Sequence, residues 1–97
     1  NNKPINVEFI QNLVASHFNL NIQELLSPRR SRSLARPRQI AMYLAKRYTT
    51  NSLPDIGRKF SNRDHTTVIH AVKKIDELIT KDNDIKQSVD ELKKKLL

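Results

Sequence analysis

The sequence predicts a single all-α domain of about six helices, on three observations. Apolar residues recur every three or four positions through most of the chain, which is the spacing of one helix face. One Gly and four Pro leave little material for tight hairpins. A length of 97 residues suffices for one small core, so we expect one domain over 1–97. Because the chain starts at Asn1 without Met, we expect it to be a fragment of a longer protein.

Two helices are expected before residue 27. The first spans about Ile5 to Phe18, with Asn6 as its N-cap, and its apolar face indicates a packing helix. The second is short and lies between Asn19 and Ser27. Its expected apolar contacts are Ile22, Leu25 and Leu26.

A basic loop is predicted at about 27–36, followed by a helix from Pro37 to about Tyr48. Pro28 breaks any preceding helix, and Pro37 fixes a backbone angle that suits a first helical turn. Arginine side chains are planar and always charged, so those of the loop suit phosphates or a narrow, AT-rich minor groove. A solvated linker or a protease-sensitive tether is the alternative interpretation.

The segment at about 52–80 predicts a helix-turn-helix. A capping box that opens at Ser52 starts a short first helix, and Gly57 within it indicates close helix packing. Asp64 is the expected N-cap, through its side chain, of a second helix that begins at His65.

The last two predicted helices close the core. The helix from His65 has apolar residues at helical intervals, among them Val68 and Ile75. A final helix runs from about Asn83 to Leu96, and its Lys93–Lys95 run is interpreted as a solvated face.

The net charge of +8 is concentrated in one block of the chain. Residues 27–66 contain ten Lys or Arg against two Asp, which equals the whole excess, whereas both flanking segments are nearly neutral. A merely soluble basic surface would scatter its charge. The block therefore indicates a polyanionic partner.

Several other classes of protein are disfavoured by the sequence. The absence of cysteine excludes disulfides and thiolate metal sites, and it is compatible with the cytoplasm. We expect no signal peptide, and there is no apolar run near the ~18 residues of a membrane span. His65 and His70 are five positions apart and share no helix face, so we expect no metal site. Since no catalytic motif is visible either, we expect no enzymatic activity.

Two sets of side chains are predicted to contact DNA. His65, Thr66 and Thr67 would read bases, because threonine offers a hydroxyl and a methyl group that packs on thymine. Asp64 can accept from a cytosine amino group, but its capping role is sufficient to explain it, and the two roles are not exclusive. The set expected to contact phosphates or the minor groove comprises Arg29, Arg30, Arg32, Arg38, Lys46 and Lys74.

Of the helix-end cations in this second set, Arg38 is the stronger candidate for a functional role. Lys46, in the last turn of its helix, complements the helix dipole and so has a structural explanation. Arg38 in a first turn has none, which favours a contact with DNA.

Three stretches of the chain resemble the C-terminal domain of the DnaA family of bacterial replication initiators. They are Ser27–Gln39, Ser52–Gly57 and Arg63–Ala71, and their order and spacing match over nearly the whole chain. The Arg-Asp-His-Thr-Thr-Val sequence that opens the third stretch is the most specific of these motifs.

The resemblance implies binding of double-stranded origin DNA at short, asymmetric boxes of the TTATNCACA type. Arg30 would enter the minor groove, and Pro54 would lie against a thymine methyl group. In the major groove the bases would be met by Asp64, His65, Thr66 and Thr67. The DNA backbone would be held by Arg29, Arg32, Arg38, Gln39, Lys46, Leu53, Arg63 and Lys74.

The resemblance also implies what this chain lacks. In the family, an AAA+ ATPase domain binds ATP and Mg²⁺, so we expect neither cofactor in these residues. We expect the isolated domain to be monomeric. Contacts with replication regulators or acidic phospholipids are left open by the sequence.

The sequence departs from the family at Ser61-Asn62, where a Gly-Gly pair usually precedes the arginine. Asn62 tolerates a left-handed backbone and can fill that turn, whereas Ser61 is less suited to it.

Two rival functions remain at this stage. A transcription repressor with a similar helix-turn-helix would dimerise on a palindrome, whereas the origin-binding hypothesis predicts a monomer on an asymmetric site. A protein-interaction module would show little salt-dependent DNA affinity and an exposed apolar patch on one helix.

Overall fold

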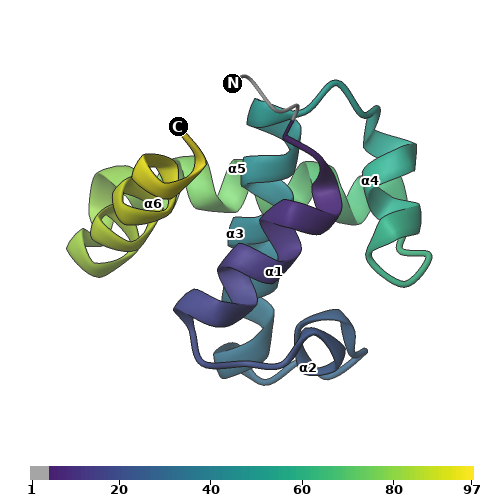
Figure 1. Ribbon diagram of the computed structural model, residues 1–97, viewed down its shortest axis with the longest axis horizontal. Coiled ribbons are helices and arrows are strands. Elements are labelled where there is room, and N and C mark those ends of the chain that lie inside the picture. Colours follow the sequence, from purple (N-terminus) through teal and green to yellow (C-terminus); the bar gives the residue numbers. More distant parts are fainter. Residues whose placement is uncertain (1–4) are drawn as a thin grey trace.

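Six helices make up the described part of the chain, residues 5–97, in the computed structural model of the protein (Figure 1). They are α1 (Val7–His17), α2 (Ile22–Leu26), α3 (Arg32–Tyr48), α4 (Leu53–Lys59), α5 (His65–Lys81) and α6 (Asn83–Leu96). The all-α prediction is confirmed. The predicted domain also includes residues 1–4, which lie outside the described residues. Within residues 5–97, no helix combines the length and apolar character needed to cross a membrane.

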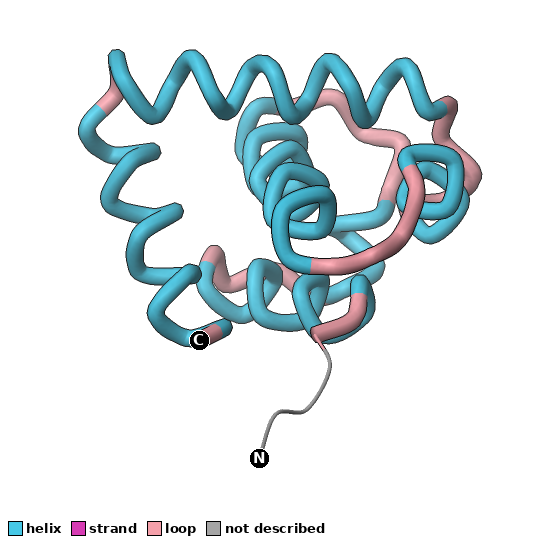
Figure 2. The backbone as a smooth tube through the Cα atoms, turned by 90° about the horizontal axis from the view of Figure 1, so that it is seen from above, coloured by secondary structure: helices cyan, strands magenta, loops and turns pink. Residues whose placement is uncertain are grey.

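The central helix of the core is α3. It packs against α1, α2, α4 and α5, and Figure 2 shows α5 running across beside it. Because neighbours lie on several sides of α3, its stretch 40–45 is buried without interruption, with side chains no more than 3% exposed. The apolar stripe of α5 meets this stretch through Val68 and Ile75, both fully buried as the periodicity predicts.

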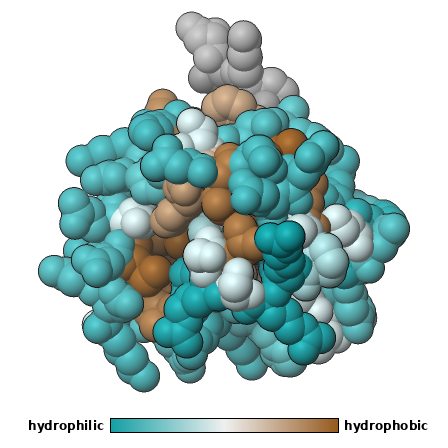
Figure 3. Space-filling view, turned by 90° about the horizontal axis from the view of Figure 1, so that it is seen from below, coloured by the Kyte–Doolittle hydropathy of each residue, from teal (hydrophilic) through white to brown (hydrophobic). Residues whose placement is uncertain are grey.

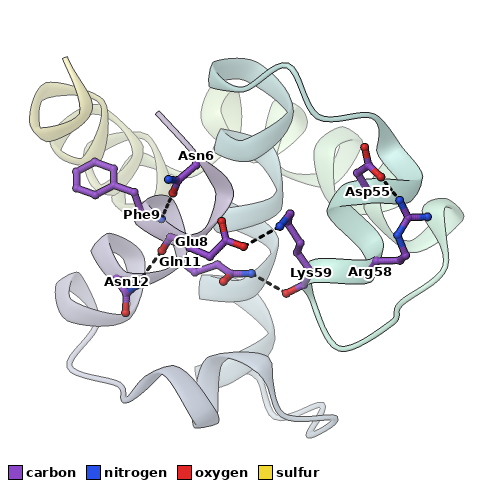
Figure 4. Close-up of polar contacts among 8 residues, drawn as sticks. All are labelled: Asn6, Glu8, Phe9, Gln11, Asn12, Asp55, Arg58 and Lys59. Carbon is purple, nitrogen blue, oxygen red and sulfur yellow. Dashed lines mark hydrogen bonds and ion pairs between the residues drawn. The ribbon is translucent and has the colours of Figure 1, made fainter. Parts of the chain in front are cut away.

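Polar contacts tie α1 to the C-terminal end of α4 (Figure 4). The buried Gln11 donates from Nε2 to the carbonyl oxygen of Lys59 at 2.8 Å, and the Lys59 ammonium lies 2.8 Å from the Glu8 carboxylate. The last carbonyl groups of a helix lack hydrogen-bond donors within the helix, and Gln11 supplies a donor to one of them. The helix-turn-helix is thereby held from its first helix onto the rest of the domain.

Side-chain caps confirm two predicted helix starts. The Asn6 side chain accepts from the Phe9 amide at 2.7 Å at the start of α1. At the start of α4 the Ser52 hydroxyl accepts from the Asp55 amide at 3.2 Å. The Asp55 carboxylate pairs with Arg58 instead of completing a capping box.

The predicted start of the third helix at Pro37 is wrong. The helix begins five residues earlier, at Arg32, and the carbonyl oxygen of Ser31 accepts the amides of Leu34 and Ala35. Pro37 therefore lies inside α3, where its missing N–H removes one helical hydrogen bond. Leu34 and Pro37 are both buried in the folded domain, which offsets that loss. The earlier start of α3 shortens the basic loop from the predicted 27–36 to residues 27–31, between α2 and α3.

Candidate nucleic-acid interface

The first turn of α5 presents three of the predicted base-reading side chains to solvent. His65, Thr66 and Thr67 are all exposed, and they follow directly on the turn that joins α4 to α5. The position of Asp64 as N-cap residue is confirmed, but the predicted side-chain cap is wrong. The Asp64 carboxylate lies 3.0 Å from Nδ1 of His65 instead.

This contact with His65 changes the role of Asp64. A carboxylate at Nδ1 favours the imidazole orientation in which Nε2 points away and is available to an outside partner. The first-turn amides of α5 donate no hydrogen bond to the Asp64 side chain, so the positive end of the helix dipole also faces outward. Both features suit an anionic, hydrogen-bonding ligand such as a nucleic acid.

The turn between α4 and α5 depends on close backbone approach. Gly57 has no side chain, and a Cβ at this position would overlap the carbonyl oxygen of Arg63. The sequence predicted close packing of helices at Gly57; the structure shows close packing against the turn. Ser61 and Asn62 both have left-handed backbones, with φ of 62° and 58°. The prediction for Asn62 is confirmed, and Ser61 adopts the geometry to which it is less suited.

Arg63 connects this turn to the end of α2. Its guanidinium donates from Nη2 to the carbonyl oxygen of Ser27 at 2.6 Å and from Nη1 to that of Phe60 at 2.6 Å. Nη1 also lies 3.3 Å from the carbonyl oxygen of Leu26. Burial lowers the pKa of Arg63. A side chain predicted to hold the DNA backbone thus uses much of its donor capacity within the protein.

Arg38 is the clearest departure from the sequence interpretation. It is only 6% exposed, and it donates to the carbonyl oxygens of Leu25 at 2.8 Å and Arg29 at 3.0 Å. The inference that Arg38 lacks a structural role is therefore wrong, since it holds both α2 and the middle of the basic loop. Burial lowers its pKa, and the nearby charge of Arg63 adds to this. Its remaining nitrogen, Nη2, is buried without a hydrogen-bond partner in residues 5–97.

A concave site of about 600 Å³ lies between the basic loop and the start of α5. Its lining includes three arginines from three different segments: the loop, α3 and the helix-turn-helix turn. The lining residues are Pro28, Arg30, Arg38, Ser61, Arg63 and Thr67. A smaller hollow of about 180 Å³ shares Arg38, Arg63 and Thr67. Positive charge and a threonine hydroxyl at one concave site suit a phosphate group.

The other predicted contact residues frame this site at different depths. Gln39 and Leu53 are partly buried, and the Gln39 side chain accepts from Arg36 at 2.9 Å. Lys46 does not line the cavity and lies about 12 Å along α3 from Arg38, the residue of that helix that does, at 1.5 Å per residue. The exposed ones are Arg29, Arg30, Arg32, Lys46, Pro54 and Lys74.

The face that carries α2 and the adjoining loop is mainly hydrophilic. Figure 3 shows this face from below: hydrophilic side chains cover most of it, and apolar side chains are visible in patches near the middle and on the left. Sequence reasoning overlooked Ser61 as a residue of the site. No local signal could have found it, because its partner Leu26 lies 35 residues away in the chain.

Two helices joined by a tight turn, with an exposed first turn on the second and a basic loop beside it, define a helix-turn-helix protein of the DNA-binding class. The comparison with known families agrees with this class. The chain belongs to the family described as "Bacterial dnaA protein helix-turn-helix", which matches residues 7–75. The resemblance found in the sequence is thereby confirmed.

Individual relatives carry the same name. The chain is 53% identical over 92 residues to the chromosomal replication initiator protein DnaA of Brucella abortus biovar 1 (strain 9-941), covering 95% of this chain and 18% of that protein. It is 53% identical over 94 residues to that of Rhodopseudomonas palustris (strain HaA2), covering 97% and 20%. The chain therefore spans about a fifth of the length of these relatives.

A solved structure gives the same fold. The chain superposes on a crystal structure of a DNA replication initiation factor with a TM-score of 0.79 and 35% sequence identity. The match covers 92% of this chain and 27% of the other.

Proposed function

We propose that this chain binds double-stranded DNA at replication-origin boxes of the TTATNCACA type, as the DNA-reading module of a replication initiator. The observation that carries the proposal is the cavity at which Arg30, Arg38 and Arg63 meet Thr67 of the recognition helix α5. Membership of the DnaA helix-turn-helix family and the names of its relatives support the link to replication.

The arrangement fits a duplex that offers two adjacent grooves. A sugar–phosphate strand separates a minor groove from the next major groove. A basic loop and a recognition helix on either side of a positively lined cavity match that order of groove, ridge and groove. In this mode Arg30 enters the minor groove, and a backbone phosphate lies at the cavity beside Arg38 and Arg63.

The first turn of α5 then faces base edges in the major groove. Thr66 and Thr67 offer hydroxyl and methyl groups, and His65 offers Nε2 while Asp64 holds its other nitrogen. Pro54, exposed in the first turn of α4, packs on a thymine methyl group. Further backbone contacts come from Arg29, Arg32, Gln39, Lys46, Leu53 and Lys74.

Both reading elements belong to one chain, so a monomer suffices for an asymmetric site. The remaining expectations are proposals of the same kind. The chain acts in the cytoplasm at the nucleoid, performs no catalysis and needs no cofactor of its own, while ATP and Mg²⁺ belong to the AAA+ part of the longer initiators. Replication regulators are proposed as additional partners, whereas no observation supports contact with acidic phospholipids.

Fluorescence anisotropy with one duplex box and a scrambled duplex, each at two salt concentrations, tests this function. Phosphate contacts weaken steeply with salt for any sequence, whereas base contacts distinguish the two duplexes. We expect tighter binding to the box that persists at the higher salt concentration. Equal binding to both duplexes that disappears with salt would reject the proposal and leave a basic helical domain.

A further inference from the structure

Three hydrogen-bond donors of the helix-turn-helix turn converge on two carbonyl groups at the end of α2. The Ser61 hydroxyl donates to the Leu26 carbonyl oxygen at 2.9 Å, and Arg63 Nη1 approaches the same oxygen. Arg63 Nη2 donates to the next carbonyl, that of Ser27, at 2.6 Å. The turn that leads into the recognition helix thus holds the residues from which the basic loop departs.

We propose that Ser61 and Arg63 are positioning residues that set the place of Arg30 relative to the recognition helix α5. The inference rests on the proposed function, since it concerns how one module presents two reading elements to one DNA site. Neither residue needs to touch a base for this role.

The loop has little else to define its shape. It contains no helix between Ser27 and Ser31, and its other anchor is Arg38, which holds Leu25 and Arg29 from α3. That anchor relates the loop to α3 alone. Within residues 5–97, the hydrogen bonds that tie the start of the loop to the turn before α5 are those from Arg63 to Ser27 and from Ser61 to Leu26, the last residue of α2.

The backbone at Ser61 strengthens the argument. Its φ of 62° is left-handed, a region in which a Cβ is strained and glycine is not. Replacing Ser61 with glycine therefore removes the hydrogen bond to the last residue of α2, from which the loop departs, and relieves strain in the same step. If Ser61 positions Arg30, Ser61→Gly should lower DNA affinity while the melting temperature stays equal or rises. If Ser61 only stabilised the fold, its replacement would not lower DNA affinity while raising the melting temperature.

The first experiment is a double-mutant cycle with Ser61→Gly and Arg30→Ala. A surface hydrogen bond corresponds to a two- to tenfold effect, so we expect Ser61→Gly to weaken box binding by about that factor. Its melting temperature should be equal to or above that of the parent. Ser61 and Arg63 together are called the clamp. In the Arg30→Ala background the loss caused by Ser61→Gly should fall below about twofold, because the clamp no longer has Arg30 to position. Equal losses in both backgrounds, or no loss in either, would overturn the proposal.

The second experiment needs no DNA and follows cleavage by trypsin after Arg29 and Arg30, identified by mass spectrometry. Ser61→Gly and Ser61→Ala both lose the hydroxyl, so both should be cleaved in the loop several times faster than the parent. Asn62→Gly is the matched control: it relieves left-handed strain at the neighbouring position, whose side chain makes no hydrogen bond within residues 5–97. Its loop cleavage should equal that of the parent.

Arg63→Lys tests the second half of the clamp. A single ammonium cannot reach the carbonyl groups of Ser27 and Phe60 as the planar guanidinium does, so loop cleavage should again accelerate. Unchanged cleavage in Ser61→Gly and Arg63→Lys would overturn the clamp. A parent that fails to prefer the box counts against the proposed function alone, because the cleavage rates still decide whether the clamp exists.

Discussion

Arg38 and Arg63 bring two guanidinium groups to the wall of one cavity, although they come from different elements and neither pairs with a carboxylate in residues 5–97. Each is held by backbone carbonyl oxygens instead, and each has its pKa lowered by burial. Two like charges kept in this way leave the cavity strongly positive. The side chains that hold the loop are therefore charged, and their positive field remains available to an anion in the cavity.

The first prediction concerns the structural share of Arg38. Arg38→Met keeps much of the side-chain volume but leaves the carbonyl groups of Leu25 and Arg29 without their donor. We expect the free energy of unfolding to fall by about 2 kcal/mol in urea titrations. Arg32→Met, at an exposed position, should stay within about 0.5 kcal/mol of the parent. Equal stability of the two variants would mean that Arg38 does not hold the loop in solution.

Arg30 should behave in the opposite way. It is exposed and lines the cavity from the loop, so Arg30→Ala removes a DNA contact without removing a protein contact. We expect at least a fivefold loss of affinity for the box by anisotropy, in line with about 1–3 kcal/mol for a specific contact. The melting temperature should not change. Lys94→Ala, on the exposed side of α6, is the charge-matched control and should keep full affinity. A large fall in melting temperature would instead assign Arg30 a structural role.

The Asp64 carboxylate gives a prediction that separates capping from DNA reading. Because it lies beside His65 and makes no cap bond, Asp64→Ala should change the unfolding free energy by less than about 0.5 kcal/mol. Box affinity should fall, since the imidazole loses the group that orients it. Ser52→Ala supplies the comparison, because Ser52 does cap its helix and its loss should cost about 1 kcal/mol. Similar destabilisation in both variants would show that Asp64 caps α5 after all.

Local patterns predicted the helices and some of their caps, because those depend on residues three or four apart. Periodicity located α1, α5 and α6 closely, and Asn6 and Ser52 cap as expected. The early start of α3 was missed because burial of Pro37 is decided by the rest of the fold.

The site was predictable in composition but only partly in arrangement. The exposed first turn of α5 followed from the helix start, whereas the buried role of Arg38 needed contacts with residues 9 and 13 positions away. The bond from Ser61 to Leu26 spans 35 residues and has no counterpart in any local motif. Which bases each side chain contacts stays a prediction.

Gly57 offers the last test, since two opposite effects of one substitution compete there. Alanine is better than glycine within a helix by about 1 kcal/mol, so Gly57→Ala would stabilise α4 if the position were free. The added Cβ would instead overlap the carbonyl oxygen of Arg63, and this backbone cannot move without displacing the turn that precedes α5. We therefore expect a net loss of about 1–3 kcal/mol in urea titrations, together with weaker box binding.

The sign of that change is decisive. The Arg63 amide donates to the Gly57 carbonyl oxygen at 2.8 Å, and the Arg63 carbonyl oxygen lies where a Cβ of residue 57 would be. Both contacts involve backbone atoms, so no flexible side chain can move aside to accept the Cβ. A gain in stability on Gly57→Ala would mean that the turn adjusts freely. The recognition helix would then not be held against α4 as tightly as this contact requires.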